Sequence, residues 1–352
     1  MSLLRYVHPA LFITITVLSL FCLADEEALQ LKHRDLPAWK EYRAKYNRRF
    51  SHDDDEERHA FHFNESLTLL TDHNFLYESG LKTFKLAINH LSDLSEALYN
   101  IRSGARRPKR RPMTMAPPTA ATAAEGATKA PLPDEVDWRQ KGLVTPVKEQ
   151  GLCSSCWAFA ATGVIEGQYA KATGQLVRLS EQNLIDCGRQ FGTRGCSGGW
   201  ADEAFDYVRA NGIDTEDSYP YTTNTETCKH NISRHLNVTV IGFADLKSEN
   251  EEALKEAVAT IGPIASAIDA SLLSFKNYGG GVYFDALCNS SSLTHGVLVV
   301  GYGNDASLGD FWTVKNSWSA EWGERGFFRI ARNRNNHCGI ATAPSYPLVK
   351  LE

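Results

Sequence analysis

The sequence predicts an α+β protein, because segments with helical periodicity come first along the chain and short β-branched or aromatic segments follow them. Its 352 residues suffice for about two folding units. Hydrophobic residues make up 43% of the chain and charged residues 22%, which is typical of a globular protein. The formal net charge of −5 argues against a nucleic-acid-binding protein, so we expect no nucleic acid among its partners.

Residues 1–24 have the pattern of a secretory signal peptide. Arg5 precedes an apolar run from Ala10 to Leu23, and the small residue Ala24 ends the segment. A membrane anchor is the alternative, but this run is shorter than the roughly 20 residues that cross a bilayer, and no later segment is apolar enough to span one. We therefore expect a product of the secretory pathway, located in the lysosome or the extracellular space.

A helical segment and a linker are predicted next. Residues 25–101 have the pattern of charged amphipathic helices, in which Trp39 and Tyr42 are the first apolar residues at helical spacing. Residues 102–131 contain almost no large apolar side chains, and such a composition does not offset its own ordering entropy. The basic run at 106–111 is either an activation cleavage site or a solvated basic stretch, and both interpretations leave it exposed to proteases.

The remaining residues, 132–352, have the composition of a compact domain. An apolar stripe predicts a helix over 156–173, which Gly174 would end. Ser248 with Glu251 forms a capping box that would begin a second helix. Strands are predicted at 264–268, 296–301, 311–314 and 327–331. This order indicates a domain in two halves, the first helical and the second made of strands.

The cysteines leave one thiol without a partner. Cys22 would depart with the signal peptide, and the seven others would remain in an oxidising compartment where pairing is the default. Cys153 and Cys156 could be a redox pair, half of a zinc site, or a disulfide partner beside a free thiol; the zinc site would also need Cys187 and Cys196. The odd count favours the free thiol. Acceptor sites for N-linked glycans occur at Asn64, Asn231, Asn237 and Asn289.

Cys156 is the first member of a candidate catalytic constellation. It would stand at a helix N-terminus, where the positive end of the helix dipole lowers a thiol pKa. His295 opens an apolar strand, although taken alone such a histidine is more often structural. Asn316 supplies an amide that can fix one imidazole nitrogen, and Trp318 supplies an indole that can cover that hydrogen bond. A nucleophile, a base and an orienting group are therefore all present.

These residues resemble the papain family of cysteine proteases and, within it, the cathepsin L type. The stretch 150–157 is similar to the family's nucleophile motif, and His295 and Asn316 follow Cys156 at the family's spacing. Further similar stretches are 136–139, 179–187, 195–199 and 338–340. The resemblance implies a papain-like two-lobed fold, with a helical N-terminal lobe, a β-barrel-like C-terminal lobe, an active-site cleft between them and a helical propeptide in front.

The implied activity is that of a cysteine endopeptidase made as a zymogen. It would hydrolyse peptide bonds of protein and peptide substrates through an acyl-enzyme thioester, with no metal and no organic cofactor. No cysteine-rich insertion follows Cys196, which favours an endopeptidase. The resemblance further implies the propeptide as an intramolecular inhibitor, cystatin-like inhibitors as partners, and a monomer. A catalytically silent secreted binding protein on the same fold is the alternative.

The resemblance assigns Cys156 as nucleophile, His295 as general acid and base, and Asn316 as the orienting residue. The Gln150 side chain and the Cys156 N–H would form the oxyanion hole, in which losing one donor typically costs about 10² to 10³ in rate. The positions that match substrate-binding residues are Gly198, Gly199, Trp200, Ala201, Ala267, Leu293, Gly296, Trp318 and Ala343. The implied S2 pocket is uncharged, so bulky hydrophobic P2 residues are expected and a P2 Arg would lack a counterion.

Three disulfides are also implied by the resemblance. They would join Cys153 to Cys196, Cys187 to Cys228 and Cys288 to Cys338, and would leave Cys156 unpaired. The residues by themselves leave this pairing open. Each bridge would typically stabilise the fold by about 2 to 4 kcal/mol.

The chain departs from the family pattern at several positions. In the helical propeptide motif only Phe63 and Asn74 are identical to the pattern, so inhibition by the propeptide is expected at altered strength. Ser154 replaces a glycine beside the S1 region and would strain the backbone if its φ were positive. Thr294 replaces an acidic or amide residue that could help to hold a thiolate–imidazolium pair. We expect retained activity with an altered pH dependence or P1 preference.

Overall fold

The computed structural model describes residues 32–105, 131–231 and 239–350. The predicted signal peptide, most of the predicted linker and Asn237 lie outside these ranges. The chain divides into two compact units, one up to Glu65 and one from Ser66 onward, and each is described by itself. Within the described ranges, no helix is both long enough and apolar enough to cross a membrane.

The first unit is a helical cluster around Trp39. Its elements are η1 (His33–Asp35), α2 (Pro37–Lys45) and the first part of α3 (Asp53–Glu78). The buried Trp39 ring stacks on Tyr42, whose ring centroid lies 4.5 Å from that of Phe63. The Trp39 indole N–H donates to Oε1 of Glu56 at 3.0 Å. The aromatic residues whose spacing predicts these helices thus pack together and form the core that the helices share.

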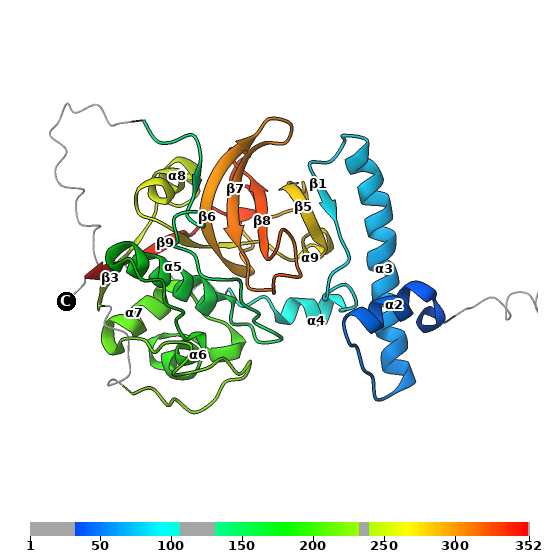
Figure 1. The fold of residues 1–352 in the computed structure, drawn as a ribbon, viewed down its shortest axis with the longest axis horizontal. Coiled ribbons are helices and arrows are strands. Elements are labelled where there is room, and N and C mark those ends of the chain that lie inside the picture. The colour runs from blue at the N-terminus through cyan, green and yellow to red at the C-terminus, as the bar shows by residue number, and fades with distance from the viewer. Residues whose placement is uncertain (1–31, 106–130, 232–238, 351–352) are drawn as a thin grey trace, which may run out of the picture. The chain divides into compact units, whose positions relative to one another are not determined.

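The second unit is built on one sheet of strands (Figure 1). Across the sheet the order is β1 (Phe84–Leu86), β5 (Tyr278–Tyr283), β8 (Phe327–Ala331), β7 (Gly309–Lys315), β6 (His295–Asp305), β4 (Ile264–Ile268), β9 (Ser345–Lys350) and β3 (Thr239–Asp245), and β2 (Val136–Asp137) pairs with β6. Neighbours are antiparallel except β5 and β8. The four predicted strands correspond to β4, β6, β7 and β8.

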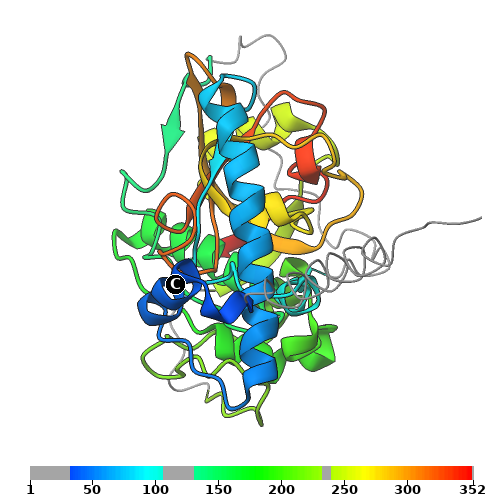
Figure 2. The ribbon, with the colours of Figure 1, turned by 90° about the vertical axis from the view of Figure 1, so that its right-hand side faces the viewer.

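Three helices gather on one side of β5, β7 and β8, which both ribbon views show (Figures 1 and 2). They are α5 (Cys156–Thr173), α6 (Glu181–Cys187) and α7 (Ala201–Asn211). The bounds of α5 are those predicted, because Gly174 ends the helix in the left-handed conformation, φ 75°. The other helical segments are α4 (Glu96–Ile101), α8 (Glu251–Thr260), α9 (Leu273–Lys276), η2 (Gly188–Phe191), η3 (Gly195–Ser197) and η5 (His337–Gly339).

The predicted capping box of α8 is wrong. Asn250 caps this helix, its side chain accepting the Ala253 N–H at 2.9 Å. Ser248 instead donates to the carbonyl of Thr342 at 2.6 Å, and the Glu251 carboxylate accepts the Trp312 indole N–H at 3.1 Å. Asn is as strong an N-cap former as Ser, and Asn250 directly precedes the first helical residue. The side chains of Ser248 and Glu251 therefore form hydrogen bonds to other parts of the fold and do not form the capping box.

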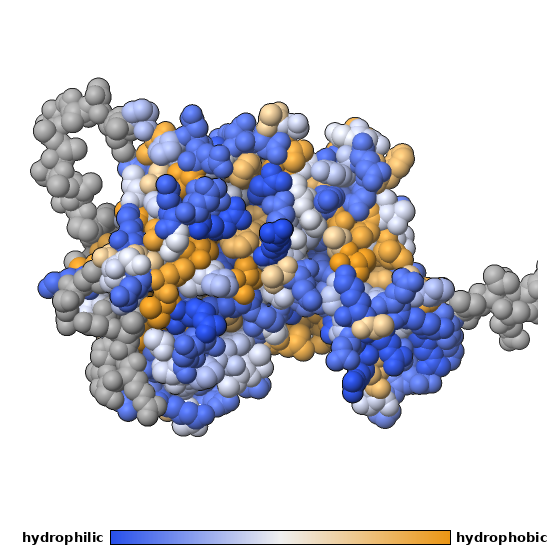
Figure 3. Space-filling view, viewed as in Figure 1, coloured by the Kyte–Doolittle hydropathy of each residue, from blue (hydrophilic) through white to orange (hydrophobic). Residues whose placement is uncertain are grey.

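Two hydrophobic cores lie on opposite faces of β6. Val297 and Val299 belong to the core formed with β5, β7 and β8, whereas Leu298 and Val300 belong to the core formed with α5 and α7. The alternation follows from the period of two of a strand that is buried on both faces. Polar residues cover most of the face drawn in Figure 3, with apolar residues in separate patches. The first residue of β6, His295, consequently lies where the two cores meet.

The front segment adds strand β1 to the edge strand β5. Phe84 pairs with Gly281, and Thr83 accepts the Val282 N–H at 2.8 Å and donates its hydroxyl to the Val282 carbonyl at 2.6 Å. A Cβ on Gly281 would lie 2.5 Å from the Thr83 carbonyl oxygen, and its φ is +92°. Only glycine fits this position without strain. The front segment and the later domain thus share one sheet.

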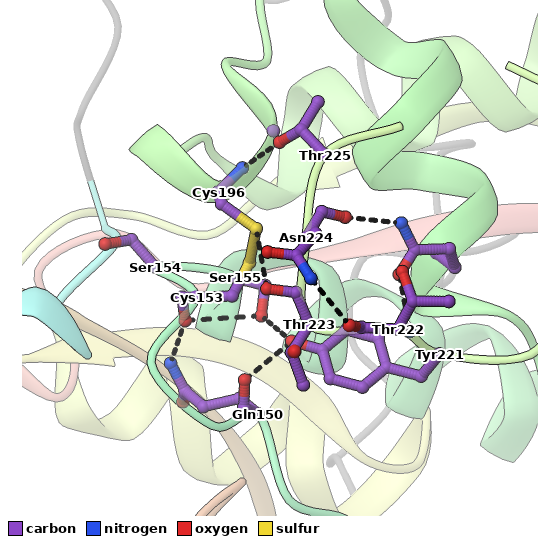
Figure 4. Close-up of a disulfide and its surroundings, with 12 residues drawn as sticks. Gln150, Cys153, Ser154, Ser155, Cys196, Tyr221, Thr222, Thr223, Asn224 and Thr225 are labelled. Atoms are coloured by element: carbon purple, nitrogen blue, oxygen red, sulfur yellow. Dashed lines mark hydrogen bonds between the residues drawn. A yellow bond between two sulfur atoms is a disulfide. The ribbon is translucent and has the colours of Figure 1, made fainter. Parts of the chain in front are cut away.

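Three disulfides join the pairs that the resemblance implies, namely Cys153–Cys196, Cys187–Cys228 and Cys288–Cys338. Figure 4 shows the first of them beside the segment that precedes α5. Cys156 is the free cysteine among the described residues, and it is buried. The redox-pair and zinc-site interpretations of Cys153 and Cys156 are therefore wrong, because Cys153 and both further zinc-ligand candidates are bonded in disulfides.

Candidate active site

Cys156 and His295 are the first residues of α5 and β6, and both side chains are fully buried. The Gly296 N–H, next to the imidazole, donates to Sγ of Cys156 at 3.2 Å. The fold thus brings together two residues that are far apart in the sequence. A helix that begins at Cys156 also points its free N–H groups toward this sulfur, which favours a negative charge there.

Asn316 fixes the imidazole of His295. Its Oδ1 lies 2.8 Å from Nε2 of His295 and also accepts the Ser317 N–H at 2.7 Å. Because Oδ1 can only accept, Nε2 carries the proton and Nδ1 of the neutral ring does not. Nδ1 is buried near the backbone of Arg102, and no side chain among the described residues bonds to it. The Trp318 ring, 4.6 Å away between centroids, covers the imidazole.

Gln150 places an amide beside the nucleophile. Its Oε1 accepts the Ser317 hydroxyl at 2.7 Å and the Trp318 indole N–H at 3.1 Å, which orients the amide. Its Nε2 donates to the carbonyl of Cys153 at 2.8 Å and to the carbonyl of Arg102 at 2.9 Å. Both Nε2 protons are therefore engaged, one of them by the front segment.

Residues 101–105, which we call the strap, lie across this site. The Gly104 N–H donates to Sγ of Cys156 at 3.3 Å, and the Gly104 carbonyl accepts the Gly199 N–H at 3.1 Å. The Ala105 N–H donates to the Thr294 carbonyl at 3.1 Å. A Cβ on Gly104 would lie 2.0 Å from the carbonyl oxygen of Ser154, so only glycine allows this approach.

The strap is also held by its side chains. Arg102 is buried and pairs with Glu149, and its guanidinium lies 6.0 Å from the Trp318 ring centroid. Ala105 packs in an apolar cluster with Trp200 and Ala267. The predicted linker begins at residue 102, whereas residues 102–105 are largely buried in the site. They lack large apolar side chains, and most of their contacts run through the backbone.

Burial keeps both reacting groups uncharged while the strap is in place. It raises the pKa of the Cys156 thiol by more than the N–H groups of Gly296 and Gly104 lower it. Burial, together with the charge of Arg102, lowers the pKa of His295 to about 4, although hydrogen bonds to Asn316 and to the Arg102 backbone act in the opposite direction. Near neutral pH the described structure therefore contains a thiol and an imidazole, and no thiolate–imidazolium pair.

Comparison with known proteins identifies the family. The model of the papain family cysteine proteases matches residues 132–348. The chain belongs to this family. A second model, the cathepsin propeptide inhibitor domain (I29), matches residues 39–98, just before the strap. The papain-family chain is thus a zymogen: a cathepsin L-like cysteine endopeptidase with its propeptide.

Named relatives and solved structures agree with this assignment. The chain is 47% identical to "Cathepsin L-like" of Caenorhabditis elegans over 88% of this chain and 91% of that protein. It is 42% identical to "Cathepsin L2" of Homo sapiens over 95% and 98% of the two chains. The structure of digestive procathepsin L 3 from Tenebrio molitor superimposes with a TM-score of 0.79 at 40% identity, covering 88% and 97%. The predicted papain-like α+β fold is confirmed.

Most predicted substrate-binding residues of this protease meet at one pocket. Among them, the lining includes Trp200, Ala201, Ala267, Gly296 and Ala343. Leu293 packs against the same cluster, and Gly199 pairs with the strap. Trp318 contacts His295 and Gln150 instead, and Gly198 is not among the lining residues. Lining residues that the sequence reasoning missed are Trp157, Ala160, Ala265, Ser266 and Ser345.

Of these missed residues, Trp157 has a signal in the local sequence, whereas the residues on strands have none. Trp157 directly follows the nucleophile and could have been found from the motif. Ala265 and Ser266 lie on β4 and Ser345 lies on β9. Only the pairing of Ala265 with Ser345 brings these residues together at the pocket. Nothing in the local sequence indicates that pairing.

The departures from the family pattern have clear structural outcomes. Ser154 has no positive φ, so its backbone is not strained in the way a left-handed residue would be. Its hydroxyl donates to the carbonyl of Ile101 in the strap. Thr294 accepts the Ala270 N–H on its hydroxyl at 2.9 Å and the Ala105 N–H on its carbonyl. Both replacements therefore lie where the propeptide meets the protease.

Of the glycan acceptor residues within the described ranges, Asn231 and Asn289 are exposed and Asn64 is partly buried. Ser66, the hydroxyl residue of the Asn64 acceptor site, is buried and donates to the Ser92 carbonyl at 2.7 Å. The exposed pair, Asn231 and Asn289, is therefore the more accessible in the folded precursor.

Because Cys156 and His295 are uncharged in the precursor, we expect the Cys156 thiol to react slowly there. Iodoacetamide reacts with thiolate, so labelling of Cys156 should be slow from about pH 5 to about pH 8 in the precursor and much faster after the strap has been removed. Mass spectrometry of the labelled peptide measures both rates, with the unfolded precursor as the reference for an accessible thiol. Equal rates before and after processing would contradict this account of the buried pair.

Proposed function

We propose that Cys156, His295, Asn316 and Gln150 carry the peptidase reaction of this zymogen. The observation that carries the proposal is the imidazole of His295. Its Nε2 is taken by Asn316, which leaves Nδ1 unprotonated, and among the described residues only the strap backbone, at Arg102, lies against Nδ1. A nitrogen in that state can accept the thiol proton. Its neighbour Gly296 already contacts Sγ of Cys156.

The proposed reaction proceeds in two halves. Nδ1 of His295 takes the Cys156 proton, and Sγ attacks the carbonyl carbon of the scissile peptide. The oxygen becomes an anion that accepts hydrogen bonds from Nε2 of Gln150 and from the Cys156 N–H. His295 returns the proton to the leaving nitrogen as the C–N bond breaks. Water, deprotonated by His295, then attacks the thioester and releases the acid and the free thiol.

Latency has a direct chemical reason in this scheme. The strap presents the Gly104 N–H to Sγ, where a substrate would have to present a carbonyl carbon. The Arg102 carbonyl occupies the Gln150 donor that an oxyanion would need. The strap therefore fills the site without offering a bond for Cys156 to attack.

The substrate preference follows from the cavity that Ala105 enters. None of the described residues that line it is charged, and Trp157 and Trp200 form part of its wall. Bulky hydrophobic P2 side chains of protein and peptide substrates would fill this space, whereas a P2 Arg would be buried without a counterion. We also propose the lysosome or the extracellular space as its location, a monomeric state, and cystatin-like proteins as inhibitors of the same cleft.

The proposed segment boundaries are a signal peptide 1–24, a propeptide 25–101, a linker with activation cleavage 102–131 and a peptidase domain 132–352. The I29 match at residues 39–98 and the papain-family match at residues 132–348 support this division.

A P2 substrate series tests the proposed site. The processed enzyme should cleave P2 Leu and P2 Phe substrates and should discriminate against P2 Arg by at least about tenfold, because burial of an unpaired charge is unfavourable.

Cys156→Ala should abolish turnover, and Gln150→Ala should lower kcat by about 10² to 10³. Thr260→Ala, at an exposed hydroxyl on α8 that bonds the Glu256 carbonyl and does not line the pocket, is the control. Equal cleavage of P2 Arg and P2 Leu would refute the pocket assignment, and turnover by Cys156→Ala would refute the nucleophile.

Ser154 should strengthen latency. Ser154→Ala removes its hydrogen bond to the Ile101 carbonyl, a contact of about 1 kcal/mol, so the precursor should release its strap and process itself about fivefold faster. The kcat/KM of the processed enzyme should stay close to that of the wild type. Thr260→Ala is the matched control, since it also removes a hydroxyl bond to a backbone carbonyl. Unchanged processing of Ser154→Ala would show that this bond has no role in latency.

A further inference from the structure

Tyr221 makes two hydrogen bonds to the segment that precedes α5. Its hydroxyl donates to the backbone carbonyl of Gln150 at 2.7 Å and lies 2.7 Å from the Ser155 hydroxyl, as Figure 4 shows. We propose that Tyr221 is a positioning residue for the Gln150 side chain, the side-chain donor of the oxyanion hole. The proposal rests on the proposed role of Gln150.

Counting protons gives the direction of both bonds. Tyr221 has one hydroxyl proton, and the Gln150 carbonyl can only accept it. The Ser155 hydroxyl must then donate to the Tyr221 oxygen. The resulting chain runs from Ser155 through Tyr221 to Gln150 and joins the two ends of residues 150–155. One end carries the Gln150 side chain, and the other directly precedes the Cys156 N–H.

The tether fixes the carbonyl side of a peptide group whose N–H side is held by Glu149. The Gln150 carbonyl belongs to the peptide that precedes Gly151, whose φ is +62°. Glycine offers little steric resistance to rotation of that peptide, so its direction depends on hydrogen bonds. The Gly151 N–H donates to Oε1 of Glu149 at 2.7 Å. The Gln150 N–H is held by the Ser317 carbonyl at 2.9 Å, and the Tyr221 hydroxyl holds the carbonyl side. Together these bonds set the direction in which the Gln150 side chain leaves the backbone.

Tyr221 is anchored independently of the segment that it holds. Its ring packs edge-on against Phe159 of α5, with centroids 5.1 Å apart, and its N–H donates to Oε1 of Glu216 at 3.0 Å. Burial raises the pKa of Tyr221 well above its usual value, so the hydroxyl keeps its proton throughout the working pH range. When the strap leaves, the Arg102 carbonyl no longer holds Nε2 of Gln150. The Tyr221 contact does not involve the strap and would remain.

Tyr221→Phe in the full precursor, processed and then assayed, tests the proposal. The oxyanion exists only along the reaction path, so kcat should fall by about tenfold while KM changes little. In a Gln150→Ala background the same substitution should cost less than about twofold, since the group that it positions is gone. Ser155→Ala should lower kcat in the same direction by a smaller factor. Ser155 makes no side-chain cap bond to α5, so this variant leaves the helix start intact.

Tyr219→Phe is the matched control. The Tyr219 hydroxyl donates to Oδ2 of Asp186 at 2.8 Å and accepts the Lys229 N–H at 3.0 Å. Within the described residues no hydrogen bond joins it to residues 150–155, so kcat should be unchanged. An equal loss from Tyr221→Phe in the wild-type and Gln150→Ala backgrounds would overturn the proposal, as would a raised KM at constant kcat. If Gln150→Ala itself leaves kcat unchanged, the proposed role of Gln150 fails instead. Should Tyr221→Phe not fold, the same two-background comparison with Ser155→Ala decides.

Discussion

The exclusion of water from Cys156 and His295 is the constraint on which latency depends. Ionising this pair separates charge, and a site without water does not solvate the two charges. The strap supplies that exclusion with a backbone N–H rather than with a bulky side chain, which is why a glycine at position 104 is necessary. Removing the five residues of the strap would therefore expose Cys156 and His295 to water and change the electrostatics of the site.

The site lies where the two cores meet, and this location fixes the positions of the nucleophile and the imidazole. Cys156 belongs to α5 in one core, and His295 begins the strand that separates the cores. A buried charge network links both sides: Lys315 of β7 donates to the Thr145 hydroxyl at 2.9 Å, and Thr145 donates to Glu166 of α5 at 2.6 Å. Lys315 directly precedes Asn316, so the residue that orients the imidazole is held to the helix that carries the nucleophile.

The sequence predicts the elements whose signals are local. Gly174 marks the end of α5 because a left-handed C-cap needs glycine, and the β-branched runs mark β4, β6, β7 and β8. The motif around Cys156, with His295 and Asn316 behind it, predicts the reacting groups. Residues 102–105 could not be placed, because backbone contacts leave no trace in composition. Tyr221 likewise belongs to no periodic element, and only the tertiary fold brings its hydroxyl to Gln150.

The protonation of His295 before and after removal of the strap tests the central claim most directly. Nitrogen NMR of the imidazole in the intact precursor should show a neutral ring, protonated on Nε2, from neutral pH down to about pH 5, because its pKa lies near 4. The processed enzyme should show an imidazolium over the same range, coupled to the Cys156 thiolate. An imidazolium already present in the intact precursor at neutral pH would contradict the claim that burial under the strap holds the pair uncharged.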